Sequence, residues 1–172
     1  MRSPRTRDYL VDLAERAPEI AARIKLEITE TLLIDNDNTV VEHLQALAAH
    51  GYRLVLDDFG TGHSSISTLR ALHFDGVKID KSFIADIPAQ GAVQPTNLLL
   101  NALLKLVQAV GGEIVCEGVE QPHQAAYLLE QGCRFGQGYH YAEPMPRGEI
   151  GRYLASQQNR RAIAAAGNGS RQ

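Results

Sequence analysis

The stretch LVLDDFGTGHSSIS, residues 54–67, decides the predicted fold. Three apolar residues run directly into two adjacent acids, Asp57 and Asp58, and a loop of glycine and small polar residues follows. Two neighbouring carboxylates repel each other, so they are costly at the end of a buried strand unless positive charge lies beside them. The stretch therefore predicts a buried strand whose end binds a cation.

The same alternation of strand, turn and helix continues in both directions from this stretch. Strand-like alternation predicts strands at 24–29, 53–57, 76–80, 113–118 and 133–139. Helical spacing predicts helices at 7–16, 39–50, 65–72, 97–110, 124–131 and 148–158. The residues expected to line one face of the helix at 97–110 are Leu99, Leu103, Leu106 and Val110. Strands separated by helices of this length form parallel βα units, so the sequence predicts an α/β fold with about five parallel strands.

Length and composition fit one soluble domain. The chain has 172 residues, of which 44% are hydrophobic, and a formal net charge of −3. This charge offers no basic surface for a nucleic-acid polymer, and no apolar run approaches the roughly 18 residues of a membrane span. Without such a span or an apolar leader, the chain is expected in the cytoplasm. Residues 1–160 are predicted to form the domain and 161–172 a disordered tail.

Acidic or polar residues stand at the C-terminal end of every predicted strand. In chain order they are Glu27 and Glu30, Asp57 and Asp58, Lys78 and Asp80, Glu117 and Glu120, and Gln137. In barrels and open α/β sheets this edge is where ligands bind. For Asp80 or Glu120 alone, a helix N-cap or a solvated rim position is an equal alternative. For the whole set, convergence on one site is favoured.

Clustered carboxylates without histidine or cysteine favour Mg²⁺ or Mn²⁺ over zinc. Adjacent aspartates such as Asp57 and Asp58 can divide between two metal ions, an arrangement that stabilises both oxygens in phosphoryl chemistry. Lys78 is the one cation of the set and could orient a hydroxide or neutralise developing charge, although an ordinary salt bridge is the alternative. Cys116 and Cys133 are predicted to be buried free thiols and are assigned no chemistry.

These residues resemble the EAL-type cyclic di-GMP phosphodiesterases of bacterial signalling. The matching segments, in the family's order, are LEITE, LDDFGTGHSS, VKIDKSF, CEGVE and GQGYHYAEPMP. The resemblance covers the chain from Asp8 to Leu154 and implies a TIM-like (β/α) barrel. It also implies hydrolysis of cyclic di-GMP to the linear dinucleotide pGpG with two divalent metal ions, Mg²⁺ or Mn²⁺.

The resemblance implies a role for each residue at the strand ends. Four residues are similar to the family's metal ligands and metal network: Glu27, Asp57, Asp58 and Asp80. Three are similar to its catalytic residues: Lys78, Glu117 and Gln137. Among these, Asp57 resembles the ligand that both ions share. Lys78 resembles the residue that helps activate the attacking water, and Gln137 resembles the residue that positions water or substrate. Glu30 resembles the acid that holds the loop 58–65 in shape, and the family links this loop to dimerisation. Glu120 resembles a residue of the substrate or metal network.

Two motifs of the family are not found in this sequence. They are the Glu-Ala-Leu motif of an early strand and an asparagine on the following strand, and both supply metal ligands. Glu42-His43-Leu44 mimics the first motif but lies in a predicted helix, so it is rejected. The sequence therefore corresponds to the C-terminal two-thirds of the family barrel, a partial barrel without the first strands, where about 250 residues are typical.

The missing ligands leave alternatives open. Metal affinity is expected to be low and turnover by this chain alone doubtful, because a partial ligand set binds weakly. A degenerate module that binds cyclic di-GMP or another protein without cleavage is one alternative, and a decayed remnant that folds poorly is another. Unpaired edges on the first and last strands predict a homodimer or pairing with a missing barrel half. A longer parent protein would add a sensor or diguanylate cyclase domain.

Overall fold

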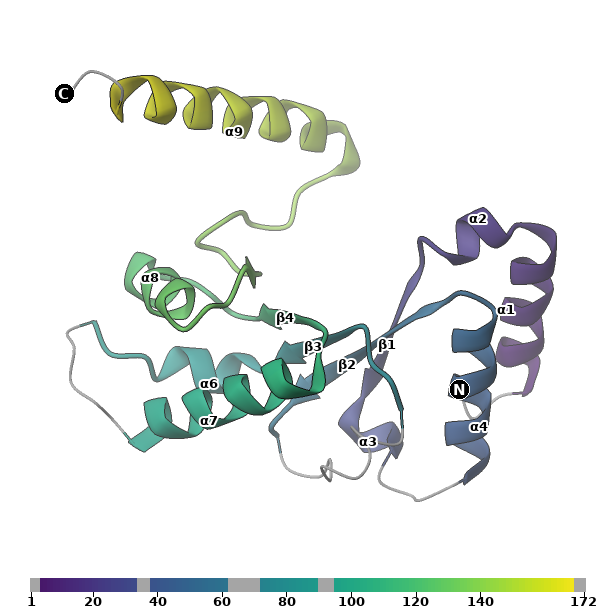
Figure 1. The fold of residues 1–172 in the computed structure, drawn as a ribbon. Coiled ribbons are helices and arrows are strands. Elements are labelled where there is room, and N and C mark those ends of the chain that lie inside the picture. Colours follow the sequence, from purple (N-terminus) through teal and green to yellow (C-terminus); the bar gives the residue numbers. More distant parts are fainter. Residues whose placement is uncertain (1–3, 34–37, 62–71, 90–94, 169–172) are drawn as a thin grey trace. The chain divides into compact units, whose positions relative to one another are not determined.

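The computed structural model describes residues 4–33, 38–61, 72–89 and 95–168. The chain divides into two compact units, Met1–Tyr141 and Ala142–Gln172 (Figure 1). The first unit contains α1 (Pro4–Arg16), α2 (Pro18–Ala21), β1 (Lys25–Thr29), α3 (Glu30–Leu33), α4 (Asn38–Ala49), β2 (Arg53–Phe59), β3 (Gly76–Ile79), α6 (Lys81–Ala85), α7 (Pro95–Val110), β4 (Glu113–Cys116), α8 (Pro122–Glu130) and β5 (Phe135–Gly136). The second unit contains α9 (Arg147–Asn168).

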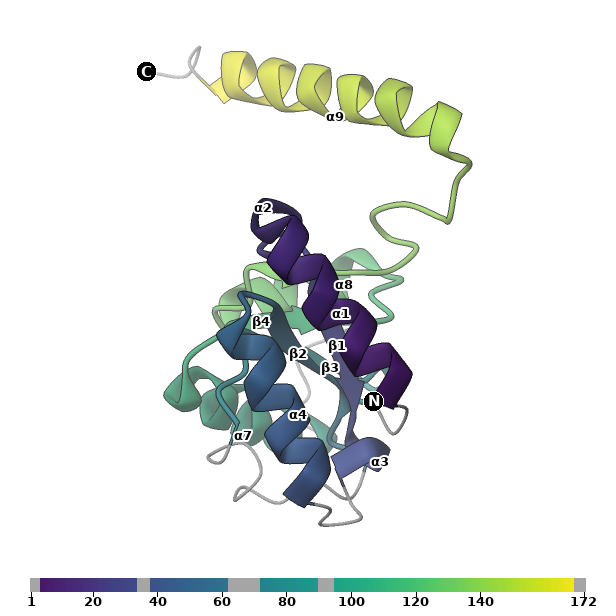
Figure 2. The same cartoon turned by 90° about the vertical axis from the view of Figure 1, so that its right-hand side faces the viewer.

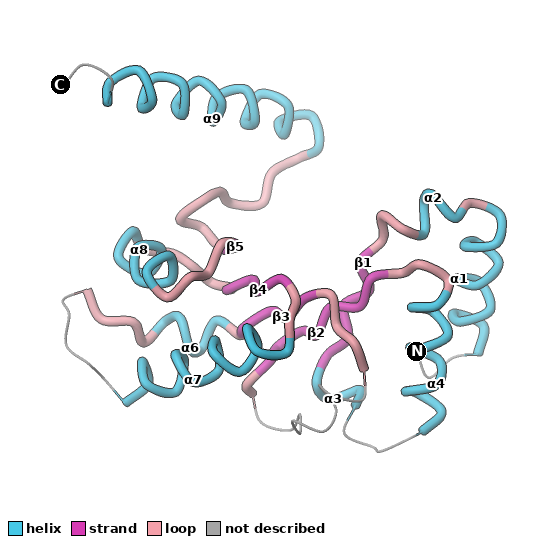
Figure 3. Tube along the Cα trace, viewed as in Figure 1, coloured by secondary structure: helices cyan, strands magenta, loops and turns pink. Residues whose placement is uncertain are grey.

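The first unit is built on one sheet of parallel strands. Its order is β1-β2-β3-β4-β5, so each strand lies beside its neighbour in the sequence (Figure 3). All four pairings are parallel, and therefore the C-terminal ends of the strands meet at one edge. The predicted α/β architecture with five parallel strands is confirmed.

The core fills both faces of the sheet. Leu54, Val55 and Leu56 of β2 are all buried, which is typical of a parallel strand covered on both sides. A second cluster joins Ala14 of α1 and Leu47 of α4 beneath Tyr52, so α1 and α4 lie side by side (Figures 1 and 2).

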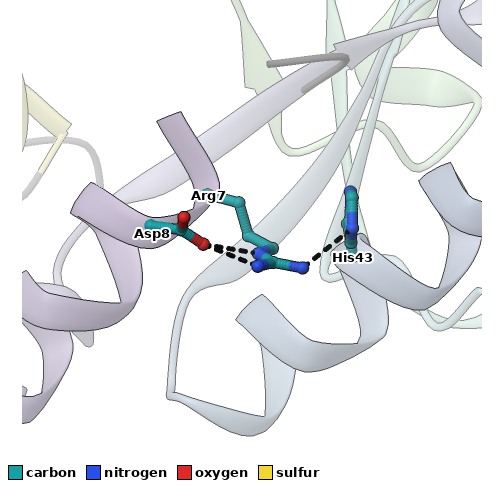
Figure 4. A network of polar contacts seen from close by, with 3 residues as sticks. All are labelled: Arg7, Asp8 and His43. Atoms are coloured by element: carbon teal, nitrogen blue, oxygen red, sulfur yellow. Dashed lines mark hydrogen bonds and ion pairs between the residues drawn. The ribbon is translucent and has the colours of Figure 1, made fainter. Parts of the chain in front are cut away.

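A polar contact fixes the same pair of helices. Arg7 donates from Nη1 to Nε2 of His43 at 3.0 Å, and from Nε to Oδ1 of Asp8 at 2.9 Å (Figure 4). His43 therefore lies inside α4, against α1. This agrees with the rejection of Glu42-His43-Leu44 as a strand motif.

The buried face of α7 overlaps the predicted one in part. Leu103 and Leu106 pack against the core as predicted, although they are only partly buried. Leu100, Leu104 and Val107 are fully buried, whereas Leu99 is 53% exposed. The two consecutive leucine runs in this helix offer overlapping faces at helical spacing, and packing on the sheet selects the face one position later.

Other boundaries also differ from the prediction. The short helices α2, α3 and α6 were not predicted, and β5 has only two residues. The predicted helix at 65–72 lies outside the described residues except for its last position. Helix α9 continues to Asn168, and alanine, which is frequent near its end, has high helix propensity. No helix in the described part of the chain has both the length and the apolar character to cross a bilayer.

Candidate metal and active site

Acidic side chains from β1, β2 and the residue after β4 meet around Lys78 of β3. Its Nζ lies 2.7 Å from Oε1 of Glu117, 3.0 Å from Oδ1 of Asp57 and 3.1 Å from Oε2 of Glu27. Glu27 belongs to β1, Asp57 to β2 and Lys78 to β3, and Glu117 follows β4 directly. The predicted convergence at the C-terminal edge of the sheet is therefore observed for these four residues.

The three acids control the charge of Lys78. Its side chain is only 12% exposed. Burial lowers the pKa of this lysine, but the hydrogen bonds with Glu117, Asp57 and Glu27 outweigh the burial, so the pKa rises well above its usual range. Lys78 is therefore an ammonium group at neutral pH, a hydrogen-bond donor and a fixed positive charge rather than a proton acceptor.

A subset of the acids fits a divalent cation. Asp57, Asp58 and Glu117 each offer one carboxylate oxygen, and these oxygens all lie within 4.8 Å of one another. Oδ1 of Asp57 is buried, and it lies 3.0 Å from Nζ of Lys78. Carboxylate oxygens gathered in this way are the ligands that hard cations such as Mg²⁺ or Mn²⁺ prefer. The residues present thus fit the metal that the sequence predicts.

A backbone irregularity lets two consecutive acids join one site. Successive residues of a regular strand point to opposite faces, which would separate Asp57 from Asp58. The β2–β3 register shifts between Leu56 and Phe59, and Asp58 has a φ of 56°. In the described chain it is the one non-glycine residue with positive φ. This bulge lets both carboxylates lie at the same edge of the sheet. Backbone strain such as the positive φ of Asp58 is common in functional sites.

Glu30 holds the turn that follows β2. Its carboxylate is buried and accepts from the backbone N of Gly60 and from Oγ1 of Thr61, both at 3.3 Å. The Thr61 hydroxyl also lies 3.0 Å from the carbonyl oxygen of Asp58. Sequence reasoning did not assign a role to Thr61, although a threonine three residues after Asp58 is spaced for such a turn. Residues 62–65 of the predicted loop lie outside the described residues.

Three predicted site residues lie outside this cluster. Asp80 caps α6, because its Oδ1 accepts from the backbone N of Ser82 at 2.9 Å. Burial raises the pKa of Asp80, but the hydrogen bonds from Ser82 outweigh it and lower the pKa overall. Glu120 and Gln137 are exposed. Among the described contacts, none joins Asp80, Glu120 or Gln137 to Lys78, and their metal or substrate roles remain predictions.

Comparisons with known proteins give one consistent result. Residues 2–144 match the family model of the EAL domain. Cyclic di-GMP phosphodiesterase NbdA of Pseudomonas aeruginosa is 39% identical over 140 residues, which are 81% of this chain and 18% of NbdA. The chain thus spans about a fifth of the length of this curated relative.

Solved structures show the same likeness. The EAL domain of Mycobacterium smegmatis DcpA matches with a TM-score of 0.74 and 32% identity, over 86% of this chain and 66% of that chain. The manganese and cyclic di-GMP complex of Klebsiella pneumoniae BlrP1 matches with a TM-score of 0.71 and 28% identity, over 83% of this chain and 36% of that chain. The resemblance and the fold class inferred from the sequence are therefore confirmed.

Proposed function

Because this chain belongs to the EAL domain family, we propose that it carries the metal-binding and catalytic edge of a cyclic di-GMP phosphodiesterase. The observation that supports this proposal most is the grouping of Glu27, Asp57, Lys78 and Glu117 at one sheet edge, with Asp58 beside them. The proposed reaction is hydrolysis of one phosphodiester bond to give pGpG.

The proposed metal ligands are two acids of β2 and the acid that follows β4. Asp57, Asp58 and Glu117 would hold Mg²⁺ or Mn²⁺, because their oxygens already lie close together. Such an ion supplies Lewis-acid stabilisation of phosphate oxygens and a more acidic water. Glu27 is about half exposed and would complete the ligand set on the open side of the cluster.

Lys78 acts through its charge in this proposal. As a permanent ammonium group, it donates hydrogen bonds to the attacking water or to a phosphate oxygen and stabilises the negative charge that develops there. Contacts with three acids fix its position before substrate arrives, so little reorganisation is needed. Gln137, at the end of β5, would position water or substrate.

A binding module without turnover is the second candidate. It is favoured by Lys78, whose fixed positive charge at the sheet edge can bind a phosphate without cleaving it. Such a module would recognise the phosphates of cyclic di-GMP through Lys78 and release the nucleotide unchanged. The two candidates differ in product formation and agree in nucleotide binding.

The test measures pGpG by chromatography after incubation of the chain with cyclic di-GMP and Mn²⁺. We expect slow product formation by the wild-type chain, in line with the low metal affinity expected from the sequence, and a further loss of at least roughly 100-fold in Glu117→Gln, on the scale of losing one electrostatic stabiliser. The matched control is Glu130→Gln, an exposed acid at the end of α8, which should leave the rate unchanged. Calorimetric binding without product would support the second candidate. Neither binding nor product would refute both.

A further inference from the structure

The chain contains two cysteines, and they lie beside each other. Sγ of Cys116 is 3.7 Å from Sγ of Cys133, and the two residues are 0% and 6% exposed. Cys116 is the last residue of β4, whereas Cys133 lies in the turn between α8 and β5. Two distant parts of the sequence thus bring both thiols of the chain into van der Waals contact.

We propose that Cys116 and Cys133 form a redox-active pair, which hydroperoxides oxidise to an intrachain disulfide next to the carboxylate cluster. Formation of this bond does not depend on the proposed phosphodiesterase activity. Only its effect on the metal site rests on the proposed function.

The surrounding backbone keeps the two thiols together. Gln137 donates from its backbone N to the carbonyl oxygen of Cys116 at 2.9 Å, and Cys133 donates to that of Leu128 at 2.9 Å. In the β4–β5 pairing Cys116 is aligned with Gly136. A disulfide requires about 2.05 Å between the sulfurs, so side-chain rotation with a small backbone shift must close roughly 1.7 Å.

Cys133 is the thiol that an oxidant can reach first. It lines an open hollow of about 290 Å³ together with Arg134, Phe135 and Tyr141, whereas Cys116 is fully buried behind it. The hydrogen bond that Cys116 donates lowers the pKa of the Cys133 thiol and so favours its thiolate. Burial of Cys133 acts in the opposite direction but is the smaller effect.

The chemistry balances with one peroxide for each pair. The Cys133 thiolate attacks one peroxide oxygen, the O–O bond breaks, and a sulfenic acid and the first water form. The sulfur of Cys116 then attacks the sulfur of Cys133, which releases its hydroxyl group as the second water and forms the S–S bond. Two thiols are oxidised and hydrogen peroxide is reduced to two waters. A dithiol reductant reverses the change by exchange.

Oxidation would act on the metal site through the end of β4. Cys116 directly precedes Glu117, whose Oε1 contacts Lys78 at 2.7 Å and whose backbone N donates to Ile79 at 3.1 Å. Drawing the Cys116 side chain toward Cys133 pulls on the backbone that positions the Glu117 carboxylate. The oxidised chain should therefore bind a divalent metal with a different affinity.

The experiment treats the full chain at low micromolar concentration with hydrogen peroxide and records its intact mass. We expect a loss of about 2 Da, for two hydrogens, that a dithiol restores. Trypsin leaves both cysteines in the single peptide 106–134, because no lysine or arginine separates them. A glutamate-specific protease cleaves after Glu117, Glu120 and Glu130 and should release two peptides joined by the disulfide.

Two variants test the order of reaction. Cys116→Ser should accumulate a sulfenic acid at Cys133 that dimedone traps, whereas Cys133→Ser should show no dimedone adduct. The wild-type peptide map alone decides the question if either variant fails to fold. A peroxide-treated chain that keeps two free thiols, or that forms only chain-to-chain disulfides on a non-reducing gel, would overturn the proposal.

A second measurement tests the link to the metal site. Calorimetric titration with Mn²⁺ should give at least a threefold difference in affinity between the oxidised and reduced chains. Equal affinities would overturn the link through Glu117, and the mass measurement decides on the disulfide independently of it.

Discussion

At the scale of single residues, the site depends on a balance between one cation and its acids. Lys78 neutralises Glu27, Asp57 and Glu117, and these acids in turn keep it protonated. Removal of the cation leaves partly buried carboxylates that repel one another. The same charge therefore stabilises the fold and prepares the site.

Replacing this cation should destabilise the chain. We expect Lys78→Met to lower the free energy of unfolding by about 1–3 kcal/mol, because partly buried acids lose their partner. Urea denaturation measures the change. The matched control is Lys25→Met on β1, whose ion pair with Glu113 is about half exposed and should contribute less than about 1 kcal/mol. Equal costs for the two variants would contradict the special role of Lys78.

The contribution of Lys78 to stability should also depend on pH. The pKa of Lys78 is higher in the folded chain than its ordinary value of 10.5. Its stabilisation is therefore complete below pH 10.5 and is lost as the pH rises through the folded-state value. We expect the difference in stability between wild type and Lys78→Met to be constant at neutral pH and to shrink above pH 10.5. A difference that grows with alkaline pH would refute this assignment.

At the scale of elements, the turn after β2 decides whether two acids can share a site. The bulge at Asp58 aims both carboxylates, and Glu30 holds the following residues. Gly60 has a φ of 101°, and a Cβ there would lie 2.5 Å from Cε2 of Phe83 on α6. The turn thus fits closely against α6, and a side chain at position 60 would push the turn away from Phe83.

Two glycine substitutions distinguish backbone strain at a positive φ from a steric clash of the new Cβ atom. Gly51 also has a positive φ, of 91°, but a Cβ there meets no atom within 4 Å. Gly60→Ala and Gly51→Ala share the backbone strain, so the extra cost of Gly60→Ala reports the contact with Phe83. We expect this extra cost to be about 1–3 kcal/mol in urea denaturation, as for an overpacked core. Similar costs for both variants would show that the turn moves freely away from α6.

At the scale of the whole molecule, stability belongs to the first compact unit. All residues of both core clusters lie between Leu10 and Cys133, within the unit that ends at Tyr141. A hydrophobic core of this kind is what allows a unit to fold cooperatively.

Shortening the chain tests this inference. We expect a chain that ends at Tyr141 to unfold cooperatively, with a free energy of unfolding within about 1 kcal/mol of the full chain, because the described core residues are all retained. Thermal and urea denaturation followed by circular dichroism measure it. Broad, non-cooperative melting of the shortened chain would show that residues 142–172 contribute to the core.

Sequence patterns predicted the strands well and the local details less well. The apolar run that ends at Asp57, together with the repeated order of strands and helices, predicted the parallel sheet and the edge where Lys78 meets its acids. The face predicted for α7 was right for Leu103 and Leu106 and wrong for Leu99, because the leucine runs fit two overlapping faces and only packing distinguishes them. The bulge at Asp58 was also not predictable, since it depends on pairing with β3. For Asp80 the sequence was consistent with either a helix N-cap or a metal ligand, and in the structure Asp80 caps α6.

The central claim is that acids gathered at the sheet edge bind a divalent cation. Calorimetric titration of Mn²⁺ into the wild-type chain and into Asp57→Asn tests it most directly, with Asp12→Asn on the exposed face of α1 as the control. We expect equal binding by the wild type and Asp12→Asn, and binding at least about tenfold weaker by Asp57→Asn. Mn²⁺ binding by Asp57→Asn as tight as by the wild type, or no binding by the wild type at all, would contradict the claim.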